Sequence, residues 1–224
     1  DMPREALEHQ VTEATPYGAL YEGDAAVRVE PGAPVEAIVR VADETGAGMV
    51  IAGTRARAGV ARFLLGSTSA ALLQRSGRPV LLIPPGDAEI VSLSHDRVAL
   101  HFGTVLAPVD LAETNATQLA WASRFAGLAR QPLELMTVLM TDQLSDHDAA
   151  SALTSRGRGL MPVAPRACIV RRGSVADEIA LCALNEGAGL VVMGLKKQGR
   201  GTPGKIASEV LRRQDALVLA VPGD

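Results

Sequence analysis

The sequence is poor in aromatic residues, in cysteine and in long apolar runs. Phe, Trp and Tyr make up only 3% of its 224 residues. Its two cysteines, Cys168 and Cys182, fit neither a disulfide framework nor the paired spacing of a zinc site. No apolar run approaches the ~18 residues of a membrane span, and no basic-then-apolar leader opens the chain. These absences argue against insertion into a membrane, and we expect a cytoplasmic protein.

The sequence also lacks a large excess of charge of either sign. A net charge of −3 gives no reason to expect nucleic acid or an anionic membrane as a partner. Two segments are nevertheless locally basic. Residues 53–86 contain five Arg and no acidic residue, and residues 194–214 contain six basic residues and one Glu. We therefore expect these segments to be the places where an anion is held.

What the sequence has in abundance is small aliphatic residues, and they are arranged as an internal repeat. Short runs of Val, Ile and Leu alternate with stretches of helical periodicity, which predicts parallel strands covered by helices on both faces. The order strand, helix, strand, loop, helix, strand occurs at 25–84 and again at 167–222. Because parallel crossovers are right-handed, the repeat predicts an α/β fold of two doubly wound, Rossmann-like sheets.

The predicted elements of the two copies correspond one to one. In the first copy we expect strands at 25–32, 49–53 and 79–84 and helices at 35–45 and 63–76. In the second copy we expect strands at 167–173, 190–194 and 216–222 and helices at 175–186 and 206–213. Gly46 and Gly187 follow the first helix of each copy and are expected to end it.

A further strand, helix and strand precede the second copy alone, at 104–110, 114–130 and 133–139. The second copy is therefore complete with five strands, whereas the first lacks its opening strands. We divide the chain into an incomplete domain at 1–86, a linker at 87–102 and a complete domain at 103–224. Within the last of these, residues 142–165 are expected to form a short helix at 146–155 and otherwise a mobile loop.

The loop after the strand at 49–53 has the features of an anion site. Gly53 ends the strand, and Gly66-Ser67-Thr68 opens the next helix. A glycine at the strand end lets backbone amides turn toward an anion, and the helix N-terminus offers further N–H donors. The alternative is that Gly66 and Ser67 only cap the helix.

This loop resembles that of the nucleotide-binding members of the universal stress protein family. Those proteins have Gly-x2-Gly-x9-Gly-Ser/Thr between their fourth strand and last helix, followed by a Pro-Val strand. The chain matches at Gly53, Gly66-Ser67 and Pro79-Val80 and departs at Ala56, where the family has glycine. The resemblance covers about residues 25–86 and 103–222 and implies binding of an adenine nucleotide, ATP, with or without Mg. The nucleotide-binding positions that it implies in this loop are Gly53, Thr54, Arg55, Ala56, Gly66, Ser67 and Thr68.

The corresponding loop of the second copy keeps less of the pattern. Gly194 and Gly204 correspond to Gly53 and Gly66, but the loop is three residues shorter, with Lys197 at the second glycine and Lys205 at the serine. We include these four residues as candidate nucleotide contacts and expect weak binding. A true P-loop is not expected, because Ile206 follows Lys205 where Ser or Thr would reach magnesium.

Asp110 ends the first strand of the complete domain, like the nucleotide-contacting aspartate of the family. The alternative is a carboxylate that caps the helix beginning near Thr114. If Asp110 contacts nucleotide, the two halves of the family site are divided between the copies. The first copy has the glycine loop without the aspartate, and the second has the aspartate with a weakened loop.

No catalytic residue or metal site stands out, so we expect a nucleotide-regulated protein of the stress response rather than an enzyme. One alternative is a scaffold of the same fold that does not bind nucleotide, and another is a weak ATP hydrolase. We also expect the last strands of the two copies, at 80–83 and 217–221, to pair as an internal pseudo-dimer, because each would otherwise leave an exposed edge. A homodimer is the other arrangement that would cover these edges.

Overall fold

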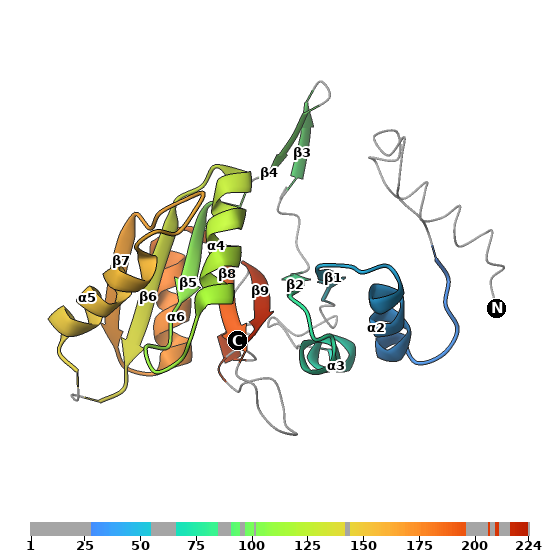
Figure 1. Ribbon diagram of the computed structural model, residues 1–224, viewed down its shortest axis with the longest axis horizontal. Coiled ribbons are helices and arrows are strands. Elements are labelled where there is room, and N and C mark those ends of the chain that lie inside the picture. The colour runs from blue at the N-terminus through green and yellow to red at the C-terminus, as the bar shows by residue number, and fades with distance from the viewer. Residues whose placement is uncertain are drawn as a thin grey trace, which may run out of the picture.

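The computed structural model describes residues 28–54, 66–84, 102–141, 144–195 and 216–223, the backbone of 91–94 and 97–100, and residues 206, 209 and 210 (Figure 1). We call 28–84 the N-terminal unit and 102–223 the C-terminal unit. The N-terminal unit contains α2 (Pro34–Glu44), β1 (Val50–Gly53), α3 (Ser67–Arg75) and β2 (Val80–Ile83). The C-terminal unit contains β5 (Thr104–Pro108), α4 (Ala116–Ala129), β6 (Leu133–Leu139), α5 (Asp146–Gly157), β7 (Ala167–Arg172), α6 (Val175–Asn185), β8 (Ala188–Leu195) and β9 (Leu217–Pro222).

In the part of the chain that the structure describes, one seven-stranded sheet runs through both units, in the order β1-β2-β9-β8-β5-β6-β7. Neighbouring strands are parallel within each unit, and β2 and β9 pair antiparallel where the units meet. In the C-terminal unit the strand order reverses between β5 and β8, which is the mark of a doubly wound sheet. The predicted fold class is therefore confirmed, and the last strands of the two copies, β2 and β9, lie side by side in the described sheet.

The register of β2 against β9 is the one that a local two-fold symmetry axis between the two strands would produce. Leu81 lies opposite Leu219, which occupies the same position in the repeat. On either side, Val80 lies opposite Ala220 and Leu82 opposite Val218, so equivalent positions exchange partners across the pair. This is how an isologous interface is built, although here both strands belong to one chain.

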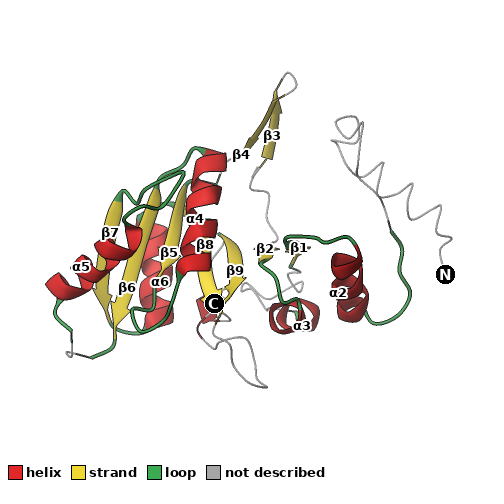
Figure 2. Cartoon of the chain, viewed as in Figure 1, coloured by secondary structure: helices red, strands yellow, loops and turns green. Residues whose placement is uncertain are grey.

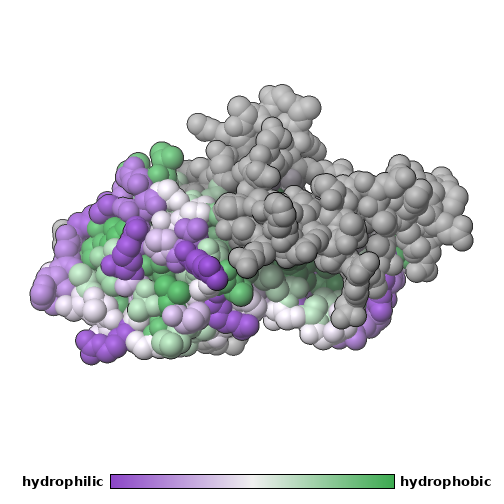
Figure 3. All heavy atoms as spheres, turned by 90° about the horizontal axis from the view of Figure 1, so that it is seen from above, coloured by the Kyte–Doolittle hydropathy of each residue, from purple (hydrophilic) through white to green (hydrophobic). Residues whose placement is uncertain are grey.

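Helices lie on both faces of the sheet in the C-terminal unit, with α4 and α5 on one side and α6 on the other (Figure 2). Buried side chains of α2, α3 and α6 form one core layer, and those of α4 and α5 form the other. Among the described elements, both helices of the N-terminal unit thus lie on the same face. Large hydrophobic side chains that remain exposed are scattered over several elements, and Figure 3 shows hydrophilic and hydrophobic areas interspersed on the described surface.

The helices of the repeat end where the sequence predicted. Gly46 follows α2 with φ 62°, and Gly187 follows α6 with φ 61°. These left-handed conformations cost a glycine little, so the helices terminate without strain. Pro34 begins α2, where the missing N–H costs no hydrogen bond.

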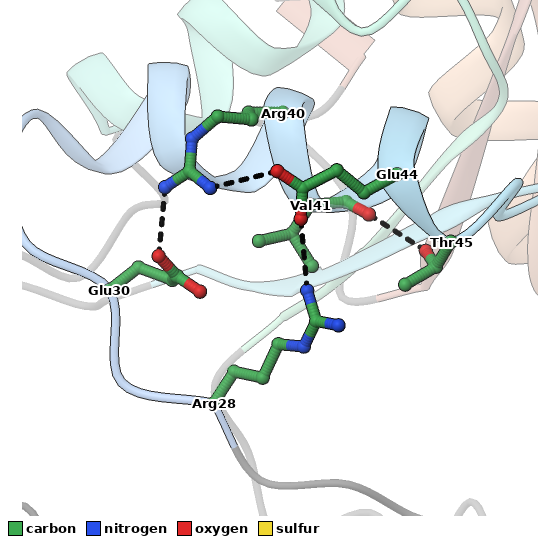
Figure 4. Close-up of polar contacts among 6 residues, drawn as sticks. All are labelled: Arg28, Glu30, Arg40, Val41, Glu44 and Thr45. Atoms are coloured by element: carbon green, nitrogen blue, oxygen red, sulfur yellow. Dashed lines mark hydrogen bonds and ion pairs between the residues drawn. The ribbon is translucent and has the colours of Figure 1, made fainter.

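The predicted strand at 25–32 is wrong over its described part, because residues 28–32 form no strand. Arg28 donates instead to Glu44 at 3.1 Å, and Arg40 of α2 donates to Glu30 at 2.8 Å and to Glu44 at 3.1 Å (Figure 4). The two carboxylates raise the pKa of Arg40. The equivalent strand β7 pairs with β6, and the chain has no predicted counterpart of β6 in the first copy. A strand without a neighbour leaves its backbone groups unpaired, and the segment packs along α2 instead.

The region predicted as a linker contains two strands that the sequence analysis missed. β3 (Val91–Ser94) and β4 (Arg97–Leu100) pair antiparallel as a separate two-stranded sheet between the units. The two serines in β3 and the residues between the strands resemble a loop in composition. The sequence feature that could have revealed them is their spacing. Two segments of four residues are separated by only two residues, which is the spacing of a β-hairpin.

The predicted short helix at 146–155 is confirmed as α5, which ends at Gly157. Residues 158–165, predicted as mobile, are instead held against α4. The Ser123 hydroxyl donates to the Val163 carbonyl at 2.9 Å and accepts from its N–H at 3.0 Å. A buried polar residue on a helix therefore fixes this return segment.

Candidate functional site

The first candidate site lies where β1 ends and α3 begins. In a right-handed crossover the helix starts at the edge of the sheet where the preceding strand finishes, so Gly53 and Gly66 face the same end of the sheet. Gly53 is the last residue of β1, and Gly66 is the N-cap of α3. The predicted helix start at 63 lies outside the described residues, and α3 is described from Ser67.

Packing against the described residues does not require glycine at either position. Gly66 has φ −63° and ψ 155°, an extended conformation open to any residue, and Gly53 has no positive φ. A Cβ built on either would have no neighbouring atom within 4 Å in the described structure. The space beside both glycines is thus open among the residues that the structure describes.

The first turn of α3 has donors available. Its N-cap makes no side-chain hydrogen bond, and Ser67 and Thr68 are both exposed. Because the first N–H groups of a helix have no intrahelical acceptor, they point toward the space beside Gly66. Gly66 itself occupies the N-cap position of α3, so the alternative that Gly66 and Ser67 only cap the helix remains beside the anion site.

Thr54 differs from the other predicted contacts. Its N–H and its hydroxyl both donate to the Ile83 carbonyl, at 2.9 and 3.1 Å. The side chain is buried, so its donor secures the end of β2 rather than facing a ligand. Thr54 therefore has a structural role next to the site, because it ties the end of β1 to the end of β2.

The positive charge expected in this segment is partly neutralised. Arg75 donates to Glu36 and Arg78 to Asp43 at 2.7 Å, both carboxylates lying on α2. The bond from Arg75 lowers the pKa of Glu36. The segment itself holds five Arg and no acidic residue, as the sequence shows, but the sequence did not show which carboxylates from α2 pack against it. Arg55 and Ala56 lie outside the described residues.

The second candidate site lies between the ends of β5 and β8, and Gln118 of α4 fills it. Its Nε2 donates to the Pro108 carbonyl at 2.7 Å and to the Val192 carbonyl at 2.8 Å. A Cβ on Gly194 would come within 2.9 Å of Gln118 Oε1. Gly194 is therefore explained by contact with a buried glutamine, unlike Gly53. Lys197, Gly204 and Lys205 lie outside the described residues.

Asp110 is exposed at the end of β5, at the mouth of the second site. Its Oδ1 accepts from the Ala112 N–H at 3.0 Å. The N-cap of α4 is Asn115, so Asp110 does not occupy the capping position of that helix. Its carboxylate shapes the loop between β5 and α4.

Arg156 of α5, which the sequence analysis missed, holds the same loop from the other side. It donates to the Glu113 carbonyl at 2.7 Å, to the Leu111 and Asp110 carbonyls, and to Asn115 Oδ1. A guanidinium can satisfy several carbonyls at once because its donors lie in a fixed fork. The position of Asp110 thus depends on α5.

No group of three or more His, Cys, Asp or Glu side chains suited to a metal ion occurs in the part of the chain that is described. None of the helices described there is long and apolar enough to cross a membrane. Cys182 is buried in α6, and burial raises the pKa of its thiol to about 11. A thiol held protonated is a poor nucleophile.

Residues 2–84 match the family described as the Universal stress protein family. The N-terminal part of the chain belongs to the universal stress protein family. Universal stress proteins of Mycobacterium tuberculosis and Mycobacterium bovis are each 35% identical to the chain over 105 residues. Those alignments cover 47% of this chain and 32% of each relative, so the chain spans about a third of their length.

The fold of the whole chain is also that of universal stress proteins. A universal stress protein of Archaeoglobus fulgidus matches 98% of the chain with a TM-score of 0.72 and 20% identity. A Pseudomonas aeruginosa protein of unknown function matches 100% of it with a TM-score of 0.71 and 18% identity. The matches cover 77% and 79% of those two chains, which therefore contain further structure.

Proposed function

We propose that this universal stress protein binds an adenine nucleotide, ATP, in the loop from Gly53 to Thr68, and that binding regulates a response to stress rather than driving turnover. The observation that carries the proposal is the unexplained pair of glycines. Gly53 and Gly66 leave space that neither the backbone conformation nor the described packing requires. A phosphate group needs such space to approach backbone amides closely.

The charge of the loop supports the same ligand. The N-terminus of α3 presents N–H groups and the positive end of the helix dipole, and the exposed Ser67 and Thr68 add hydroxyl donors. Arg75 and Arg78 are engaged by α2, so the phosphate must be held chiefly by amides and hydroxyls and by arginines earlier in the loop. Magnesium, if present, would come with the nucleotide.

The C-terminal unit is the weaker binder in this proposal. Its Gly194 is accounted for by Gln118, which occupies the space between β5 and β8. Asp110 remains the candidate nucleotide contact of this unit. The shorter loop with Lys205 at the serine position supplies charge without the short hydroxyl donor.

The test is Gly66→Val, with Gly48→Val as the matched control. Gly48 lies just before β1, at the opposite end of the strand from Gly53, and its Cβ would also meet no atom within 4 Å. We expect Gly66→Val to weaken ATP binding at least tenfold, or ~1.4 kcal/mol, because the side chain fills the phosphate space. Gly48→Val should bind like the unmodified chain. Isothermal titration measures both.

Equal affinity in the two variants, with the same unfolding midpoint, would exclude this loop as the site. No heat of binding in the unmodified chain would favour the scaffold alternative. Release of phosphate from ATP at a rate that Gly66→Val abolishes would favour the weak hydrolase instead.

A further inference from the structure

We propose that Gln118 is the residue that closes the C-terminal unit to nucleotide, because its side-chain amide occupies a ligand position of that unit. This role of Gln118 rests on the proposed function, since it presupposes that the fold holds ATP. A short loop with Lys205 would by itself give weak binding that no change at Gln118 improves. A crevice filled by one side chain is instead opened by one substitution.

The crevice exists because β5 and β8 stop pairing before either strand ends. Their last paired residues are Leu106 and Val191, whereas β5 continues to Pro108 and β8 to Leu195. On their other sides both strands stay paired to the end, β5 with β6 and β8 with β9. The two strands therefore part where the strand order reverses, which is the place where doubly wound sheets bind ligands.

The amide of Gln118 takes up this crevice. The carbonyls of Pro108 and Val192 lie beyond the last pair of β5 and β8, and both accept from Gln118 Nε2, at 2.7 and 2.8 Å. Oε1 of the same amide lies 2.9 Å from where a Cβ on Gly194 would be. The side chain is buried, so one planar group spans the crevice from β5 to the end of β8.

Two carbonyls that converge on one NH2 group define the chemistry of the position. It accepts a planar group with two N–H donors, and the amino group of an adenine base is such a group. While Gln118 makes these bonds, a ligand finds neither the acceptors nor the space, because a protein interior is close-packed. The C-terminal unit thus has a position that seeks a donor, and its own side chain fills it.

The rest of the C-terminal crevice keeps features of a site. Asp110 is exposed at its mouth, and Gly194 still lacks the side chain that would close it from β8. In the N-terminal unit no described atom would lie within 4 Å of a Cβ on Gly53, which corresponds to Gly194. The difference between the two units at this pair of glycines is therefore the amide of Gln118.

The experiment titrates ATP calorimetrically into whole chains that carry Gly66→Val, so that the N-terminal loop is silent. Adding Gln118→Ala should tighten ATP binding by roughly tenfold or more, because it frees both carbonyls and the space between them. ITP, whose base has a carbonyl in place of the amino group, should bind this double variant roughly tenfold more weakly than ATP.

Ser123→Ala in the same background is the matched control. Ser123 is also a buried polar residue of α4 with two bonds to backbone, but they go to Val163, away from the crevice. Its loss should leave ATP binding as weak as in Gly66→Val alone.

Acetamide tests the ligand position without ATP, because it carries the atoms that Gln118→Ala removes. It should raise the urea midpoint of Gln118→Ala and not that of the unmodified chain. N,N-dimethylacetamide has no N–H group and should raise neither. If Gln118→Ala is unfolded in buffer, the same comparison is read from the recovery of helical circular dichroism.

The role of Gln118 is overturned if the unmodified chain binds ATP and the folded double variant binds it no better than Gly66→Val. If the unmodified chain binds no ATP, the proposed function fails, and the acetamide comparison alone decides. Equal effects of the two amides on Gln118→Ala would then show that Gln118 occupies no ligand position.

Discussion

At the scale of single residues, the same amino acid can stand at two equivalent positions of the repeat for different structural reasons. Gly194 is glycine because Gln118 stands 2.9 Å from where its Cβ would be, whereas Gly53 has open space. The sequence predicted both as nucleotide contacts because the repeat gave them the same context. It did not reveal Gln118, although that residue falls on the same helical stripe as Leu119, Ala122 and Ala126, where a polar side chain must be buried. Partners from other elements decide such cases, and a sequence does not show them directly.

Cys182 gives a prediction of pH dependence. Burial raises its pKa from 9.0 to about 11, so between these values the thiol ionises in the unfolded chain while it stays protonated in the folded one. The folded state is then disfavoured as pH rises, and the stability contribution is complete only below pH 9. We expect urea midpoints to fall between pH 8.5 and 10.5 in the unmodified chain and to fall less in Cys182→Ala. Cys168→Ala is the control and should keep the full decline.

At the scale of elements, the strands and helices of the repeat were predictable because their periodicities are clear. β6 has the bounds that the sequence predicted, and α2 and α6 agree within one residue. The strand at 25–32 failed for a physical reason. Its apolar pattern is that of β7, but a strand forms only where a neighbour accepts its hydrogen bonds, and that information is not local. The hairpin of β3 and β4 was missed because its serines weakened the apolar signal.

The packing of α4 against β5 and β8 gives a prediction for Gln118 and Gly194. Gln118→Ala leaves the Pro108 and Val192 carbonyls without their side-chain donor, at a cost of about 1–3 kcal/mol for each buried group. Gly194→Ala should destabilise the chain as well, because its Cβ displaces the glutamine that makes those bonds.

In the double variant Gln118→Ala, Gly194→Ala, the loss of stability caused by Gly194→Ala should largely disappear, because no glutamine is left for the added Cβ to displace. A double-mutant cycle from urea unfolding measures this coupling. Strict additivity of the two losses would show that Gln118 does not fix the space beside Gly194.

At the scale of the whole molecule, the continuous sheet predicts that both units unfold together. Leu81 and Leu219 are buried and lie opposite each other in the β2–β9 pair. Leu219→Ala should cost ~2–5 kcal/mol, as expected for a buried leucine. It should also speed hydrogen exchange in β1 and β2, although the mutation lies in the C-terminal unit. Two separate unfolding transitions, with only the C-terminal one shifted by Leu219→Ala, would contradict this prediction.

The pairing of β2 with β9 also sets an order of events during synthesis on the ribosome. Leu81 and Leu219 lie more than half of the chain apart in sequence, so this contact closes a very long loop. β2 is made before β9, so its edge stays unpaired until β9 has emerged. Until then an apolar strand edge is open to any other strand nearby. A growing chain of this protein is therefore most in need of a chaperone in the interval between the synthesis of β2 and that of β9.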